Sequence, residues 1–110
     1  MKQYVVDELR PADYEKVKRH LDDTAETGSL DGVYWIPVRT SLLTPEQARH
    51  KDCHPLCFAL CLDRDRLCCE LLLRTHHRIR CTCIDYATVK QRNWIIRQVD
   101  AMFKALDIKI

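Results

Sequence analysis

The sequence predicts a small α+β protein, and three observations support this class. Amphipathic helix patterns lie near the two ends of the chain, at residues 11–25 and 88–106. Between them lie segments in which apolar and polar residues alternate, as is typical of strands. The 110 residues are 46% hydrophobic and 31% charged, with only two glycines, which indicates a packed core rather than disorder. At this length we expect one domain over residues 1–110.

The first helix is predicted over residues 11–25. Pro11 suits the first helical position, where its missing N–H is not needed. Asp13 places a negative charge in the first turn, near the positive end of the helix dipole. Val17 and Leu21 lie four residues apart and form part of an apolar stripe.

A threonine followed three residues later by a glutamine predicts a helix start at two further places. In the first, Pro45 follows the threonine, and a short helix to about Lys51 is expected. In the second, the helix is expected to run to Leu106. The two pairs are Thr44 with Gln47 and Thr88 with Gln91.

Four segments have the composition of strands in one antiparallel sheet. The segment at 33–38 contains Pro37, which cannot donate to a neighbouring strand, so we expect it at an edge. The other three form a meander with polar turns between them. We therefore expect an antiparallel sheet of about four strands, with both long helices packed on one face as a two-layer sandwich. The meander strands are expected at 56–62, 67–74 and 78–85.

The register of the first hairpin follows from its turn. A two-residue turn at Arg64 and Asp65 pairs residues whose numbers sum to 129. Leu60 then faces Cys69, and apolar side chains meet along the whole hairpin. In the second hairpin, a three-residue turn at 74–76 would place Cys69 opposite Cys81 and Glu70 opposite Arg80.

Seven cysteines are present, an odd number that does not suit a secreted disulfide framework. Reduced thiols that pack as small apolar groups are the simpler interpretation. In the predicted register, Cys69, Cys81 and Cys83 belong to the core face. The opposite face is mixed rather than polar, so it could serve as a contact surface for a partner or a second copy. Its cysteines are Cys57, Cys61 and Cys68.

Histidines and one cysteine are expected to gather at one end of the meander. Extending the first hairpin register places Cys53 near His76. Imidazole nitrogen and thiolate sulfur are common zinc ligands. The sequence therefore yields a zinc hypothesis as one alternative. The candidate ligands are His50, Cys53, His54, His76 and His77.

Basic residues favour a second alternative, a weak nucleic-acid interface. Arg74, Arg78 and Arg80 lie in a run without acids, and the last two point to the same face of a strand. The element order helix, three strands, helix resembles that of double-stranded-RNA-binding domains in topology alone. A shared order of elements implies no function.

Other chemistry is less well supported by the residues. A cysteine–histidine nucleophile pair would need Cys53 or Cys57 beside His54 or His76, together with an orienting group. The chain has only two glycines, at positions 28 and 32, and their spacing excludes a phosphate-binding loop. Whether the protein is an enzyme is left open.

The function expected first is a protein-interaction role through the mixed sheet face, without catalysis, with a protein partner or a second copy as ligand. The N-terminal segment lacks the long apolar run of a secretory signal, and no run is long enough to cross a membrane. A cytoplasmic location is therefore expected. The formal net charge of the chain is +2.

Overall fold

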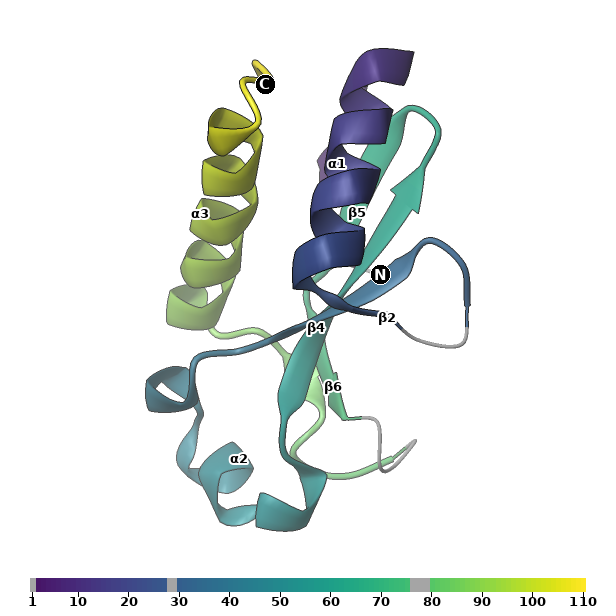
Figure 1. The fold of residues 1–110 in the computed structure, drawn as a ribbon. Helices are drawn as coiled ribbons and strands as arrows, with labels where there is room; N and C mark the ends of the chain where they lie inside the picture. The colour runs from purple at the N-terminus through teal and green to yellow at the C-terminus, as the bar shows by residue number, and fades with distance from the viewer. Residues whose placement is uncertain (1, 28–29, 76–79) are drawn as a thin grey trace.

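The computed structural model describes residues 2–27, 30–75 and 80–110, and within them the fold is of the α+β class. Figure 1 shows α2 at one end of the molecule and the long helices α1 and α3 toward the other. The helices are α1 (Pro11–Thr24), α2 (Pro45–Arg49) and α3 (Val89–Ala105), with 3-10 turns η1 (Thr40–Leu42) and η2 (Lys51–Cys53) on either side of α2.

The sheet contains seven short antiparallel strands among the described residues, not about four as predicted. Five follow the order β1-β5-β4-β3-β2, and β6 pairs with both β4 and β7. That both long helices lie on one face of a two-layer sandwich stays a prediction. The strands are β1 (Gln3–Val6), β2 (Glu26–Thr27), β3 (Val33–Pro37), β4 (Leu56–Asp63), β5 (Arg66–Glu70), β6 (Leu72–Thr75) and β7 (Asp85–Tyr86).

The sequence signals place all three helices close to their observed bounds. In α2 and α3, each threonine hydroxyl accepts a hydrogen bond from the backbone N–H of the glutamine three residues on. Each glutamine side chain in turn accepts from the backbone N–H of its threonine. In α1 the capping residue is Arg10, whose N–H donates to the Asp13 carboxylate over 3.4 Å. These local bonds satisfy N–H groups that a helix start leaves without partners.

The register of the β4–β5 hairpin is confirmed only from the turn to the pair Leu60–Cys69, with Asp63 opposite Arg66. Beyond Leu71 the pairing with β4 is shifted by two residues, so that Leu56 faces Thr75. Leu71 itself leaves the β4 ladder, and its N–H donates to the carbonyl of Lys2 over 3.1 Å. A shift of two residues keeps every side chain on its predicted face, and Leu73 is fully buried.

The second hairpin register is wrong. Residues 80–84 form no strand, and β6 pairs instead with β7, so that Leu73 faces Asp85. The carboxylate of Glu70 pairs with Arg74 over 3.1 Å rather than with Arg80. The strand prediction failed here because alternating residues in this segment fit a turn as well as a strand.

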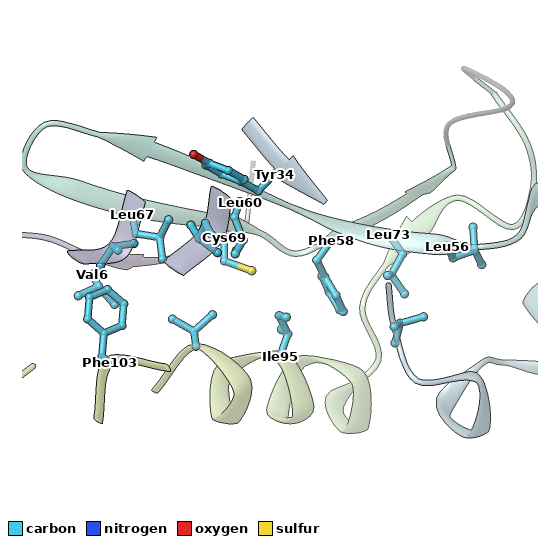
Figure 2. Packing of buried hydrophobic residues seen from close by; sticks show 14 of the residues in the cluster. Val6, Tyr34, Leu56, Phe58, Leu60, Leu67, Cys69, Leu73, Ile95 and Phe103 are labelled. Atoms are coloured by element: carbon cyan, nitrogen blue, oxygen red, sulfur yellow. The ribbon is translucent and has the colours of Figure 1, made fainter. Parts of the chain in front are cut away.

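Apolar side chains of both long helices and of the strands form one hydrophobic core. Val17 and Leu21 of α1 share one buried cluster with Phe58 and Leu60 of β4. Figure 2 shows side chains of the strands pointing toward Ile95 and Phe103 of α3. The same buried cluster continues to Cys53, Leu56 and Cys83 at the α2 end, where polar contacts add to it.

Two buried glutamines supply those contacts. The Nε2 of Gln91, at the start of α3, donates to Oε1 of Gln47 in α2 over 2.9 Å and to the carbonyl of Leu42 over 2.8 Å. Gln47 Nε2 donates to the carbonyl of Cys83 over 3.3 Å. Both side chains are almost inaccessible to solvent, so these bonds replace the water that the amides lose.

We expect Gln91→Ala to lower the free energy of unfolding by about 1–3 kcal/mol, because it leaves buried polar groups without partners. Gln98→Ala is the matched control, since Gln98 is exposed on the same helix. Urea denaturation followed by circular dichroism measures both. Equal losses in the two variants would contradict the role given to the buried amide.

Candidate metal centre

Four possible metal ligands meet at the α2 end of the molecule. The ligand atoms of His50, Cys53, Cys81 and Cys83 all lie within 4.8 Å of one another. The Nδ1 atom of His50 is 3.0 Å from Cys81 Sγ, and the Cys53 thiol donates to the same sulfur over 3.7 Å. Three sulfur atoms and one imidazole nitrogen thus converge from two segments of the chain.

The first two ligands are positioned by the end of α2. His50 caps the helix, and the chain continues into η2, where the Cys53 N–H donates to the His50 carbonyl over 2.9 Å. Side chains three residues apart in a 3-10 turn lie above one another. The spacing of His50 and Cys53 therefore brings both ligands to the same side of the turn.

The other two ligands come from a turn that leads into β7. The N–H of Ile84 donates to the carbonyl of Cys81 over 3.0 Å, which closes the turn. The Thr82 hydroxyl, between the two cysteines, donates to Glu46 Oε1 over 2.7 Å. Together with the bond from Gln47 to the carbonyl of Cys83, this contact ties the turn to α2.

Glu46 also orients the imidazole. Its Oε1 lies 2.9 Å from Nε2 of His50 and accepts a hydrogen bond when Nε2 carries the proton; loss of the proton from Nδ1 then leaves a lone pair directed at the sulfur atoms, as metal binding requires. A carboxylate that accepts from the second ring nitrogen is the usual support of a metal-bound histidine. Hydrogen bonds from Thr82 and Arg49 lower the pKa of Glu46, which keeps this acceptor ionised.

The thiols of the site differ in acidity. A hydrogen bond from the backbone N–H of Cys83 lowers the pKa of the Cys81 thiol to about 6, and bonds with the side chains of Cys83, His50 and Cys53 act in the same direction. Burial raises the pKa of Cys83 to about 12. Cys81 is therefore the thiol best suited to ionise near neutral pH, and thiolate is the form that binds metals.

The dimensions of the cluster fit one ion. Two sulfur atoms that each lie about 2.3 Å from a tetrahedral zinc ion are about 3.8 Å apart. The Cys53–Cys81 separation of 3.7 Å matches this value. The Nδ1–Sγ distance of 3.0 Å is shorter than the corresponding edge of about 3.6 Å, so metal binding would move these two atoms slightly apart.

The predicted zinc ligands are thus brought together in part. His50 and Cys53 belong to the cluster. The Nε2 of His54 instead donates to the backbone carbonyl of Gln47 over 2.8 Å. His76 and His77 lie outside the described residues.

Cys81 and Cys83 are the ligands that sequence reasoning missed. The sequence predicts both on a core strand because their alternation fits one, and Cys83 is indeed 1% exposed. The missed signal is the Cys-x-Cys spacing, which a turn can direct toward a single point. Cys69, which was grouped with them, is buried in the core as expected.

The predicted basic surface is only partly described. Arg74 is paired with Glu70, which neutralises its charge locally. Arg80 is exposed, and Arg78 lies outside the described residues. These positions supply no further support for a nucleic-acid interface.

No family model, curated protein sequence or solved structure matches the chain. Among the residues that the structure describes, no helix has the length and apolar character needed to cross a membrane. We therefore infer the function from the geometry of the site.

We expect the metal-free protein to contain one thiol that iodoacetamide alkylates rapidly, with a rate that rises through about pH 6. The sign follows from the lowered pKa, because thiolate accumulates once the pH exceeds it. Peptide mass spectrometry should locate the label on Cys81. Cys68→Ser is the control and should leave the profile unchanged, whereas a midpoint near pH 8.5, the ordinary range for cysteine, would contradict the assignment.

Proposed function

We infer that the protein is a metal-binding module that holds one zinc ion at His50, Cys53, Cys81 and Cys83. The observation that carries this proposal is the convergence of four ligand atoms within 4.8 Å. Three thiolates with one imidazole form a common donor set of structural zinc sites. Four protein ligands leave no open position for a substrate, so the proposed role of the ion is structural.

The ligand chemistry favours zinc over harder ions. Magnesium and calcium select oxygen ligands, which this site lacks in its inner set. Sulfur-rich tetrahedral sites also hold iron–sulfur clusters, but four ligand atoms within 4.8 Å of one another suit a single ion rather than a cluster of several metal ions. Zinc is therefore the ion proposed.

The proposed ion would add a link between two segments that lie far apart in the sequence. Cys53 and Cys81 are 28 residues apart in sequence, and each lies in a short turn rather than a long element. Because such a site does not exist in the unfolded chain, the free energy of metal binding adds to folding stability.

Thiol catalysis is the second candidate, and one arrangement favours it. Cys81, His50 and Glu46 follow the order of nucleophile, base and orienting carboxylate, with separations of 3.0 and 2.9 Å. The sequence alone indicates a different pair, Cys53 or Cys57 with His54 or His76. Two further sulfur atoms beside Cys81 suit a metal better than a substrate, so zinc binding is preferred.

We expect purified protein to contain about one zinc ion per chain by elemental analysis. His50→Ala and Cys81→Ser should lose most of it, because each removes a ligand. His54→Ala is the matched control and should keep it, since the His54 ring bonds to a backbone carbonyl. Chelation should lower the melting temperature by at least about 10 °C. Metal-free protein whose stability is insensitive to chelators would refute zinc binding and favour thiol catalysis.

Association through the sheet face opposite the core is a separate proposal, which concerns what the module contacts. A row of side chains crosses four strands through the pairs Val5–Cys68, Cys68–Cys61 and Cys61–Val33. Val5 is 39% exposed and the others are half-buried, so the row presents apolar surface. Cys57, predicted on the same face, is fully buried and is not part of this accessible row.

If a second copy covers this row, Cys68→Glu should weaken self-association, because it places a charge in an apolar contact. Analytical ultracentrifugation over a range of concentrations measures the effect. Arg66→Glu, in an exposed position of the same strand, is the control. A wild-type protein that stays monomeric at the highest concentration would contradict association between copies.

A further inference from the structure

We propose that Cys53 and Cys81 form a reversible disulfide, so that thiol oxidation and metal binding compete for the same sulfur atoms. The regulatory meaning of this inference rests on the proposed zinc site. The pairing of the two cysteines itself rests on their positions in the structure.

The three thiols of the site differ in their access to solvent. Cys53 and Cys83 are 2% and 1% exposed, whereas Cys81 is only partly buried. A soluble oxidant therefore meets Cys81 first. Cys53 and Cys83 are too buried to meet the oxidant directly, so they can react only with Cys81 after Cys81 has formed a disulfide with the oxidant.

Cys53 is the suitable partner for this second step. Its thiol donates to Cys81 Sγ over 3.7 Å, and a disulfide bond requires about 2.05 Å, so the sulfur atoms need to approach by about 1.7 Å. Both residues lie in short turns, where small adjustments disturb no strand pairing. Cys83 is a poorer partner, because one intervening residue leaves a short and strained ring.

A small disulfide such as glutathione disulfide can serve as the oxidant of the two cysteines. The Cys81 thiolate attacks one sulfur atom of glutathione disulfide, which forms a mixed disulfide and releases one glutathione thiolate. The Cys53 thiolate then attacks the Cys81 sulfur and releases the second glutathione thiolate. The two cysteines lose two electrons, glutathione disulfide gains them, and the zinc ion leaves as a divalent cation.

Oxidation would thus replace the zinc ion by a disulfide as the link between the two segments. The disulfide connects the same two segments that the ion connects, but only His50 and Cys83 remain as ligands. Two ligands do not hold zinc against chelators, so the metal is released while the turns stay joined.

The experiment uses the full chain, with its zinc content measured first, and glutathione disulfide as the probe. A chromogenic chelator follows zinc release, and mass spectrometry of unreduced peptides identifies the linkage. We expect release of up to one zinc ion per chain together with a Cys53–Cys81 link, both reversed by dithiothreitol. Cys68→Ser, a cysteine outside the site, should behave like the wild type.

Cys53→Ser should stop at the first step and carry one glutathione on Cys81. If this variant does not fold, the linkage map of the wild type still decides the pairing. Cysteines that stay reduced, a link between Cys61 and Cys68, or a lasting glutathione adduct on wild-type Cys81 would overturn the inference. A zinc-containing protein without the link contradicts the pairing alone, whereas a zinc-free protein that forms it contradicts only the proposed function.

Discussion

The buried amide pair of Gln47 and Gln91 is the interaction on which the candidate site depends. It joins the start of α2 to the start of α3, and Gln47 reaches on to the carbonyl of Cys83. Each amide also completes the cap of its own helix. A single set of hydrogen bonds therefore fixes both the direction of α2 and the position of the cysteine-bearing turn. Because the amides are shielded from water, a misplaced partner would leave polar groups unsatisfied at substantial cost.

Among the described residues, the α2 end is built from short elements, namely α2, the turns η1 and η2, and the turn closed by the bond from Ile84 to Cys81. Its apolar side chains, Cys53, Leu56 and Cys83 among them, belong to the same buried cluster as those of α1 and α3. Glu46 contributes a second polar connection through Thr82 and His50. An ion bound by three thiolates would leave one negative charge in excess at the site. The site is thus assembled by contacts that also stabilise the fold.

Local rules predicted the elements whose signals are local. The threonine–glutamine pairs fixed the starts of two helices, and the Arg64–Asp65 turn fixed the hairpin register as far as Cys69. The break at Leu71 could not be read from the sequence, because it depends on pairing with β1, far away in the chain. For the same reason His50 and Cys53 were found but Cys81 and Cys83 were not. Their spacing fits a core strand equally well, and the turn depends on the bond from Ile84 to Cys81 together with the contacts to α2.

The most direct test of the zinc site is X-ray absorption spectroscopy at the zinc edge of the purified protein. The account predicts three sulfur neighbours at about 2.3 Å and one nitrogen neighbour at about 2.0 Å, with no second metal nearby. A first shell composed mainly of oxygen and nitrogen would contradict it, because such an ion could not lie among Cys53, Cys81 and Cys83.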